Sequence, residues 1–412
     1  MTPKFVFGKE KNDWIKRPLL SNIEKILDYR GRTPKKLGLS WSDTGFLALS
    51  ALNVKNGYID FNADANYGDQ ELYNRWMGDN NLHKGQVVFT TEAPMGNVAQ
   101  IPNDALYILS QRTIAFEVKH HLIREDFLAT LLRSPKIFNE LTSLSSGGTA
   151  KGISQKSLSN LKISLPASLD EQSAIGSLFR TLDDLLASYK DNLANYQSLK
   201  ATMLSKMFPK AGKTIPEIRL ERFEGEWEEK CIGEIADIVR GASPRPIQDP
   251  KWFDSNSEIG WLRISDVTSQ NGRIHSLEQK ISKLGQEKTR VLTEPHLLLS
   301  IAATVGKPVV NYVKTGVHDG FLIFMNPKFD REFMFQWLEM FREKWNRYGQ
   351  PGSQVNLNSD IVKNQKILIP CMEEQKAIGA YFSNLDNLIV AHQEKISQLE
   401  TLKKKLLQDM FI

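Results

Sequence analysis

The sequence predicts an α+β protein: two similar mixed α/β domains are joined by two long helices that form an antiparallel coiled coil. Three observations support this fold class. The 412-residue chain repeats itself once, each repeat opens with short β-type runs, and each closes with a proline-free amphipathic segment of about 38 residues. The predicted order is a first domain over 1–165, a long helix over 166–209, a linker over 210–216, a second domain over 217–369 and a long helix over 370–412.

The repeat is clearest where each half enters its helix. Leu169-Asp-Glu-Gln-Ser-Ala-Ile-Gly176 recurs as Met372-Glu-Glu-Gln-Lys-Ala-Ile-Gly379, at a shift of 203 residues. Just upstream, Lys162-Ile-Ser-Leu-Pro166 matches Lys366-Ile-Leu-Ile-Pro370. Further matches keep the same order over most of the chain, so both halves are expected to share one fold.

Each half begins with about 150 residues rich in short β-type runs separated by Gly, Pro and Asn. The runs at 45–50, 86–90 and 113–118 have counterparts at 259–264, 297–301 and 320–325. Short helices are expected after them, over 124–132 and 330–341. This alternation predicts a mixed sheet with helices in each half.

The closing segments show a seven-residue apolar period. In the first helix the repeated positions are Ile175, Leu182, Tyr189, Tyr196 and Met203, and in the second they are Ile378, Leu385, His392, Leu399 and Leu406. A single amphipathic helix packed on its own domain is the alternative, but five heptads in two equal copies favour a coiled coil.

The direction of the helices follows from the repeat. If a pseudo-two-fold axis relates the halves, the helices run antiparallel. Ile175 then lies towards Leu406, and Met203 lies towards Ile378. The midpoints of the helices are Tyr189 and His392, so this pair is predicted to meet at the centre of the coiled coil.

Composition narrows the class of protein. Hydrophobic residues make up 41% and charged residues 25%, as in ordinary globular proteins. Two cysteines, Cys231 and Cys371, argue against a disulfide scaffold and a cysteine-based zinc site. The N-terminus lacks the apolar core of a signal peptide, and no stretch approaches the roughly 20 apolar residues of a membrane span. We therefore expect a cytoplasmic protein with no membrane partner.

One pattern suggests catalysis. Asp104, Glu117 and Lys119 resemble the carboxylates and lysine that hold Mg²⁺ in many nucleases. The string is common, and the corresponding run of the second half, Phe324-Met-Asn-Pro327, keeps none of these residue types. A Mg-dependent nuclease using these three residues is the alternative function, and a scaffold without a DNA role is a third.

The loops fit nucleic-acid contacts better. A net charge of +5 permits such binding without requiring it. Arginines and lysines surround a Gly and a Pro in matching loops of both halves, where they could reach phosphates or guanine edges. Two later loops, 145–152 and 349–356, are rich in Gly, Ser and Thr and could hold a phosphate. Solvated surface charge and plain loops are the alternatives. The predicted DNA contacts are Arg30, Arg32, Lys35, Lys36, Thr90, Thr91, Gln111, Arg112, Lys151, Arg240, Arg245, Arg263, Lys307, Gln354 and Asn356.

Two β-rich halves, each ending in Lys-Ile-x-[Leu/Ile]-Pro and a Glu-Gln-x-Ala-Ile-Gly helix, resemble the specificity (S) subunit of type I restriction–modification enzymes. The resemblance covers essentially the whole chain. It implies two target recognition domains, each reading one half of a bipartite, asymmetric site in double-stranded DNA. It also implies that the helices set the spacing between the halves and dock the methyltransferase subunits.

The resemblance further implies a non-catalytic chain that binds no cofactor or metal itself. Two methyltransferase (M) subunits would carry S-adenosylmethionine. Two restriction (R) subunits would carry ATP and Mg²⁺. The DNA target depends on a few loop side chains whose direction the sequence leaves open.

Overall fold

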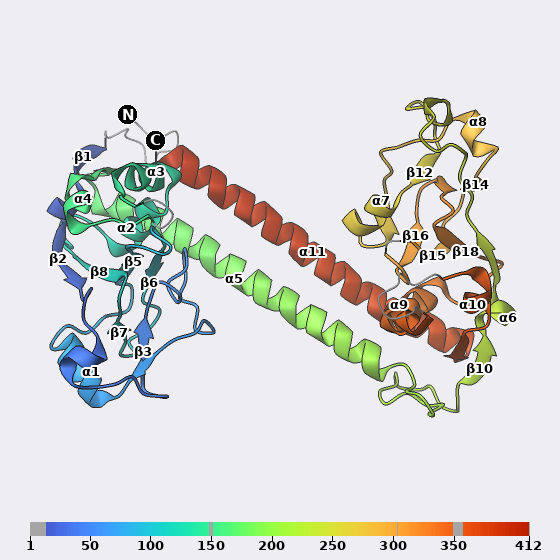
Figure 1. Ribbon diagram of the computed structural model, residues 1–412, viewed down its shortest axis with the longest axis horizontal. Helices are drawn as coiled ribbons and strands as arrows, with labels where there is room; N and C mark the ends of the chain where they lie inside the picture. Colours follow the sequence, from blue (N-terminus) through green and yellow to red (C-terminus); the bar gives the residue numbers. More distant parts are fainter. Residues whose placement is uncertain (1–13, 148–150, 303, 349–356, 412) are drawn as a thin grey trace. The chain divides into compact units, whose positions relative to one another are not determined.

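A computed structural model describes residues 14–147, 151–302, 304–348 and 357–411 (Figure 1). The chain divides into two compact units. Unit 1 comprises Met1–Asp191 and Glu394–Ile412, and unit 2 comprises Asn192–Gln393. Among the described residues, no helix combines the length and apolarity that a membrane span requires.

Unit 1 is built on a four-stranded antiparallel sheet in the order β2-β8-β5-β6. A three-stranded sheet, β4-β3-β7, lies beside it, and β1 pairs with β9 so that Ile15 faces Leu165. The strands are β1 (Ile15–Pro18), β2 (Ile23–Asp28), β3 (Phe46–Leu49), β4 (Tyr67–Gly68), β5 (Val87–Thr90), β6 (Val98–Gln100), β7 (Ile108–Leu109), β8 (Thr113–Val118) and β9 (Lys162–Leu165).

Unit 2 repeats this plan. Its main sheet has the order β11-β18-β15-β16-β13, its second sheet the order β12-β17-β14, and β10 pairs with β19. The strands are β10 (Glu228–Cys231), β11 (Asp237–Arg240), β12 (Gly260–Leu262), β13 (Arg273–Ile274), β14 (Arg290–Leu292), β15 (Leu297–Ser300), β16 (Pro308–Asn311), β17 (Thr315–Val317), β18 (Phe321–Met325) and β19 (Lys366–Ile369).

The shared order confirms that the two halves have one mixed α/β fold. Strands β2-β8-β5-β6 correspond to β11-β18-β15-β16, and the parallel pair β3–β7 corresponds to the parallel pair β12–β17. The units differ at the margins, because β13 extends the main sheet of unit 2 and because β4 pairs with β3 whereas β14 pairs with β17.

Short helices cover the sheets. In unit 1 they are η1 (Leu19–Asn22), η2 (Pro34–Leu37), α1 (Gln70–Met77), α2 (Glu125–Leu132), α3 (Pro135–Leu144) and α4 (Gln155–Asn160). In unit 2 they are α6 (Ile232–Ile235), η3 (Pro250–Trp252), α7 (Ile264–Ser269), α8 (Lys283–Gln286), α9 (Arg331–Phe341), η4 (Arg342–Tyr348) and α10 (Ser359–Lys363). The expected helices at 124–132 and 330–341 are thus α2 and α9.

The long helices are α5 (Leu169–Lys206) and α11 (Met372–Met410), and they run antiparallel. In unit 1 the carboxylate of Asp183 pairs with the ammonium group of Lys403. In unit 2 Lys200 Nζ lies 2.5 Å from Asp386 Oδ1. A shift of 203 residues relates Asp183 of α5 to Asp386 of α11, and Lys200 of α5 to Lys403 of α11. The two ion pairs are therefore repeat equivalents: α5 supplies the aspartate in unit 1 and the lysine in unit 2. This reciprocity requires opposite helix directions.

The apolar contacts agree with this direction. Ile175 packs in the same cluster as Leu406, and Met203 packs in the same cluster as Ile378. His392 lies edge-on to Tyr196, with ring centroids 5.1 Å apart, and its Nδ1 donates to the carbonyl oxygen of Leu388. Tyr189 belongs to the other unit, so its predicted meeting with His392 stays a prediction.

The repeated glutamine of the helix motif has a packing role. Gln172 donates to the carbonyl of Pro166 and accepts the backbone N–H of Arg124, each at 2.9 Å. Gln375 likewise donates to the carbonyl of Pro370 and accepts the backbone N–H of Asp330, each at 2.9 Å. Both side chains are buried, so each one ties the start of its long helix to the start of α2 or α9.

The repeated glycine permits a close approach of the same elements. A Cβ atom at Gly176 would lie 2.4 Å from the Cβ of Asp126, and one at Gly379 would lie 2.7 Å from Asp330 Oδ1. Only glycine lets the backbones of α5 and α2, and of α11 and α9, come this close. The Glu-Gln-x-Ala-Ile-Gly motif therefore joins the β-rich part of each repeat to its long helix.

The end of each helix completes a hydrophobic core. In unit 1 the ring of Phe411 lies 6.3 Å from that of Phe179, and in unit 2 the ring of Phe208 lies 6.3 Å from that of Phe382. A shift of 203 residues again exchanges the members of these pairs. The surrounding aromatic residues also correspond: Trp14 and Phe127 in unit 1, Trp227 and Phe333 in unit 2.

Candidate nucleic-acid interface

Four segments of unit 1 meet at one edge of its main sheet. Asp28 lies opposite Ile114, and Thr90 lies opposite Thr113, so the ends of β2 and β5 lie beside the start of β8. A bridge between Glu92 and Gly152 adds the segment that precedes α4. We call residues 29–37, 91–97, 110–112 and 151–153 the first loop edge. It brings together all six cations predicted from the first half.

The arginines of this edge are held by neighbouring groups. Arg30 Nε lies 2.9 Å from both carboxylate oxygens of Asp28, and Arg112 Nε lies 3.3 Å from Glu92 Oε1. Arg32 donates to the carbonyl of Trp76, with its guanidinium carbon 4.6 Å from the Tyr29 ring centroid. These contacts orient the guanidinium groups before any ligand arrives.

The Asp28 carboxylate remains ionised in this environment. Burial acts to raise its pKa, but hydrogen bonds from Arg30 and Gln155 outweigh burial, and the pKa is lowered. The charged carboxylate therefore holds the Arg30 guanidinium in place at the end of β2.

Other predicted residues of this edge are exposed. Lys36 Nζ donates to the carbonyl of Gly31, and Gln111 Nε2 donates to the carbonyl of Arg32, both at 2.7 Å. Lys35 and Lys151 form no ion pair with the described part of the chain. The lysines can contact phosphates without first breaking a salt bridge.

The structure buries two of the predicted contacts. Thr90 and Thr91 are 0% and 1% exposed. The hydroxyl of Thr90 accepts the backbone N–H of Asn97 at 2.9 Å, and that of Thr91 donates to the carbonyl of Arg112 at 3.1 Å. Both side chains stabilise turns of the first loop edge. Their hydroxyls point inwards because neighbouring segments cover the end of β5.

A hollow of about 530 Å³ opens beside the first loop edge. Its lining combines apolar residues with polar ones; the apolar residues are Pro34, Trp41, Ala51, Leu52, Ala65 and Ala93, and the polar ones are Thr33, Ser50, Asp64, Asn66, Ser110, Gln111 and Arg112. Hydrogen-bonding groups therefore surround a recess close to the predicted cations.

Unit 2 has the corresponding arrangement. Arg240 lies opposite Leu322, and Ser300 lies opposite Phe321, so the ends of β11 and β15 lie beside the start of β18. We call residues 241–249, 304–307 and 318–320 the second loop edge. Arg240 lies at the end of β11, directly before the first of these segments.

Asp319 organises the second loop edge. Arg240 Nε donates to its carbonyl at 2.7 Å, Arg245 lies 2.5 Å from its carboxylate, and Ser243 donates to that carboxylate at 2.8 Å. Burial acts to raise the pKa of Asp319, but Ser243, His318 and both arginines lower it more. The Arg245 side chain remains 72% exposed, so it is available to a phosphate.

A second hollow, of about 570 Å³, opens beside this edge and is mostly apolar. Its lining is Ile247, Gln248, Pro250, Phe253, Trp261, Arg263, Ile264, Gln279 and His318. Arg263 is held by Asp266, with Nη2 2.9 Å from Oδ1, and keeps 37% of its side chain exposed. It therefore lies on the wall of the hollow as an oriented cation.

Lys307, another predicted contact, is paired within the fold. Its ammonium group lies 2.7 Å from Glu339 Oε1 and 2.8 Å from Asn271 Oδ1, and 13% of its side chain is exposed. The ion pair with α9 neutralises the charge that the sequence appeared to offer to DNA. Gln354 and Asn356 lie outside the described residues.

Sequence reasoning missed His318 and Asp319. The ring of His318 packs edge-on to Trp261, 5.7 Å between centroids, and its Nδ1 accepts the N–H of Gly320 at 2.8 Å. A His-Asp-Gly turn directly before a β-type run was the available signal. The neutral ring with its proton on Nε2 is the form that fits this hydrogen bond.

The imidazole of His318 should titrate below its ordinary pKa of about 6.5. Burial lowers the pKa most, Arg245 and Arg240 lower it further, and Asp319 opposes them. Since the unfolded chain takes up this proton more readily, the contribution to stability is complete above pH 6.5 and is lost as the pH falls below it. Nuclear magnetic resonance titration should show a higher pKa in Arg245→Ala and a lower pKa in Asp319→Asn. Equal pKa values in all three proteins would contradict this environment.

Two of the three residues of the nuclease alternative form hydrogen bonds with backbone groups of unit 1. Asp104 accepts the backbone N–H of Lys84 at 3.3 Å, and Lys119 Nζ donates to the carbonyl of Ser21 at 3.3 Å. Across the described ranges, no three His, Cys, Asp or Glu side chains gather in a way that could hold a metal ion.

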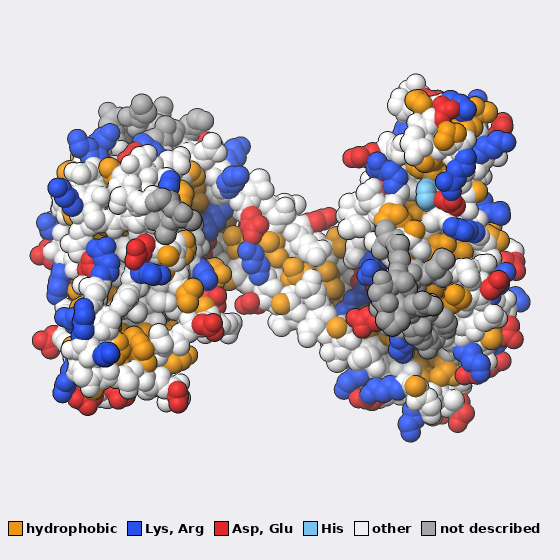
Figure 2. All heavy atoms as spheres, in the orientation of Figure 1, with side chains coloured by type: hydrophobic (Ala, Val, Ile, Leu, Met, Phe, Trp, Pro, Cys, Tyr) orange, Lys and Arg blue, Asp and Glu red, His pale blue; other side chains and the backbone are white. Residues whose placement is uncertain are grey.

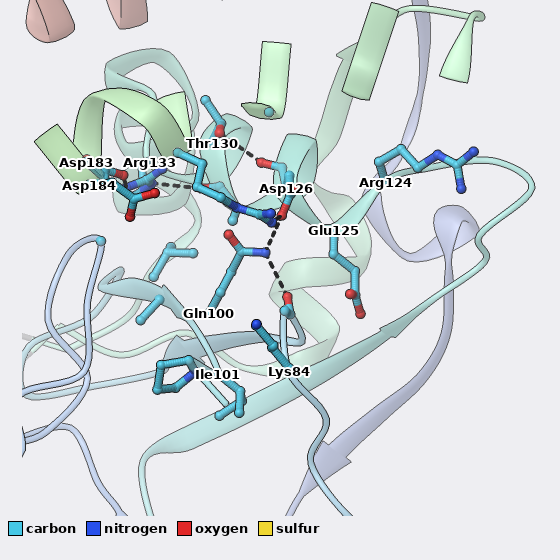
Figure 3. A pocket seen from close by; sticks show the side chains of 18 of the residues that line it. Lys84, Gln100, Ile101, Arg124, Glu125, Asp126, Thr130, Arg133, Asp183 and Asp184 are labelled. Atoms are coloured by element: carbon cyan, nitrogen blue, oxygen red, sulfur yellow. Dashed lines mark hydrogen bonds and ion pairs between the residues drawn. The ribbon is translucent and has the colours of Figure 1, made fainter. Parts of the chain in front are cut away.

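The hollow of about 680 Å³ in unit 1 lies at the joint with α5 (Figure 3). Gln100 Nε2 donates to Asp126 Oδ1 at 2.7 Å, and Arg133 Nη1 lies 2.6 Å from Asp183 Oδ2. In Figure 3 the Arg124 side chain points away from these pairs. Because both carboxylates are already paired, this polar hollow serves the attachment of α2 to the long helix.

Comparison with known proteins identifies the family. The model for the type I restriction modification DNA specificity domain matches residues 9–195 and again 224–401. The chain belongs to the type I restriction–modification DNA specificity family. Specificity subunits are the non-catalytic, DNA-recognising subunits of these complexes, which agrees with the paired loop edges.

Relatives of this type I specificity chain include two proteins of Methanocaldococcus jannaschii. The type I restriction enzyme MjaVIII specificity subunit is 24% identical over an alignment of 320 residues, and the match covers 73% of this chain and 72% of the relative. The putative type I restriction enzyme MjaX specificity subunit is 23% identical over an alignment of 427 residues, gaps included, and the match covers 98% of this chain and 94% of the relative.

Solved structures show the same fold. The S subunit of a type I restriction-modification system from M. genitalium superposes with a TM-score of 0.66 at 16% identity, covering 100% of this chain and 99% of that one. A chain from a study of complex assembly and conformational transition of the type I R-M system gives 0.51 at 18% identity, covering 98% and 99%.

Proposed function

We propose that this chain selects the DNA sequence for a type I restriction–modification complex. The first loop edge reads one half of a bipartite site, and the second loop edge reads the other. The observation that supports this is that equivalent ends of two equivalent sheets carry different side chains. The hollow beside the first loop edge is lined by polar and apolar side chains in similar measure, including Asp64 and Asn66, whereas the hollow beside the second loop edge is mostly apolar and aromatic. Unlike readers suit an asymmetric site, whereas two identical readers would require a palindrome.

The long helices are proposed to dock two M subunits. Their exposed surface carries leucines that are repeat equivalents: Leu185 and Leu402 in unit 1, at 41% and 46% exposure, and Leu388 and Leu199 in unit 2, at 40% and 38%. Hydrophobic side chains are visible along this helical surface in Figure 2. Matching apolar pairs in both units would suit two copies of one partner.

The remaining components belong to the partners in this proposal. The M subunits bring S-adenosylmethionine, and two R subunits bring ATP and Mg²⁺, while this chain contributes DNA recognition and spacing. The test is selection from a random duplex pool by the chain with and without its M subunit. Enrichment of a split sequence supports the proposal. Cleavage by the chain alone that is lost in Glu117→Ala, or no binding under either condition, would overturn it.

Alanine variants of Arg30, Arg32, Arg240 and Arg245 should weaken DNA binding. Removing an arginine that contacts a phosphate should weaken binding to all sequences evenly. It should also reduce the slope of log affinity against log salt concentration by about one. Removing an arginine that contacts a base should lower the discrimination between bases at one target position by about 1–3 kcal/mol. Binding would be measured at several salt concentrations. Lys366→Ala, an exposed cation of β19 paired with Glu229, is the control. Parental affinity in all four variants would exclude these loops from the interface.

Glutamate at both Leu185 and Leu402 should reduce the number of bound M subunits from two to one, because charges replace an apolar contact. The same change at Leu388 and Leu199 should remove the other copy. Native mass spectrometry of the purified complex would count the subunits. Ile215→Glu, at an exposed linker position, is the control. Full assembly in both double variants would place the docking surface elsewhere.

A further inference from the structure

The mostly apolar hollow of unit 2 has an aromatic floor. Trp261 is buried, and the Phe253 ring lies 6.4 Å from it at an interplanar angle of 64°. The His318 ring meets Trp261 at 65° from the side of the second loop edge. Ile247 and Gln248, from the loop that follows Arg245, complete this side. The hollow is therefore continuous with the cations proposed to hold the DNA backbone.

His318 places one hydrogen-bond donor at this hollow. Its Nδ1 is occupied by the N–H of Gly320, so the proton of the neutral ring is on Nε2. Among the residues that the structure describes, none accepts a hydrogen bond from Nε2. A donor with no protein acceptor thus stands beside an apolar wall.

We propose that this hollow reads a thymine in the second half of the DNA site. His318 Nε2–H donates to O4 of the base, and the 5-methyl group lies against Phe253 and Ile247. Thymine alone among the four bases presents an acceptor next to a methyl group in the major groove. Arg245 contacts a neighbouring phosphate and fixes the approach. This assignment rests on the proposed function and adds the base class that one edge selects.

The equivalent hollow of unit 1 lacks this combination. Ser110 precedes β8 where His318 precedes β18, and Gln111 and Arg112 border the recess. Gln248, Gln279 and Arg263 also border the hollow of unit 2, but the described lining of the unit 1 recess contains neither a histidine donor nor a phenylalanine. The thymine preference is therefore confined to the half-site read by unit 2.

The experiment begins with the target that the full chain and its M subunit select from a random duplex pool. Replacing the relevant thymine by 2′-deoxyuridine removes only the methyl group, and should weaken binding by about fourfold. His318→Ala should lower the preference for thymine over the other bases about tenfold at that one position, and leave the other half-site unchanged. The deoxyuridine measurement uses the unaltered protein, so it does not depend on the folding of a variant.

His296→Ala is the matched control, because His296 precedes β15 at the opposite end of the strand from the second loop edge. It should select the parental sequence. Equal binding of thymine and deoxyuridine at every position of that half-site, or an unchanged selection by a folded His318→Ala, would overturn the thymine assignment alone. Failure of the unaltered complex to select any sequence would instead overturn the proposed function.

Discussion

Replacing Phe411 with alanine should destabilise unit 1, although the residue is next to last in the chain. Phe411 is almost fully buried among Trp14, Phe127 and Phe179. Removing a buried phenyl ring typically costs about 3–5 kcal/mol, from lost burial and from the cavity that remains. Phe208→Ala should have the same effect on unit 2, where Phe208 packs on Trp227, Phe333 and Phe382.

Hydrogen exchange measured by mass spectrometry would assign each loss to a unit, since a chain with two units need not unfold in one step. Faster exchange in β2, β5 and β8 is expected for Phe411→Ala, and in β11, β15 and β18 for Phe208→Ala. Phe138→Ala removes a ring that is 45% exposed and should cost less than about 1 kcal/mol. The opposite result, faster exchange in unit 2 for Phe411→Ala and in unit 1 for Phe208→Ala, would show that the end of each long helix does not pack in the core assigned to it here.

Reversing the charge of Asp183 should be nearly as damaging. Its carboxylate lies 2.6 Å from Arg133 Nη1 and also pairs with Lys403, and these three side chains are mostly buried. Lysine at this position would leave three cations together with no carboxylate, at a cost of about 3–5 kcal/mol. Hydrogen exchange of β2, β5 and β8, measured at increasing denaturant concentration, would give the loss in unit 1.

A neighbouring residue and a reciprocal change test this interpretation. Asp184→Lys makes the same charge change at the next, exposed position, and should cost under about 1 kcal/mol. Combining Asp183→Lys with Lys403→Asp restores an opposite pair between the helices and should recover part of the stability, with Arg133 limiting the recovery. An equal loss for Asp183→Lys and Asp184→Lys would mean that the interhelical pair contributes nothing specific.

Periodicity and repetition determined the helical framework. Apolar residues every seven positions predicted α5 and α11, and the shift of 203 residues predicted both the shared sheet order and the opposite helix directions. These features can be predicted because a heptad pattern relates residues that are close in the sequence, and because a repeat is found by comparing the sequence with itself. The motif Glu-Gln-x-Ala-Ile-Gly was visible as a repeat, but its role as a joint required α2 and α9 to be placed against it.

The loop edges depended on tertiary structure. Thr90 and Lys307 looked like surface polar residues, yet the strand turn buries the first and Glu339, 32 residues away, neutralises the second. The role of His318 was not predictable, because only the packing of β18 and β12 with the loop after β11 places it beside Trp261. The sequence alone thus determined the elements and their symmetry. Exposure and charge pairing were decided by the fold, because both depend on neighbours that are distant along the chain.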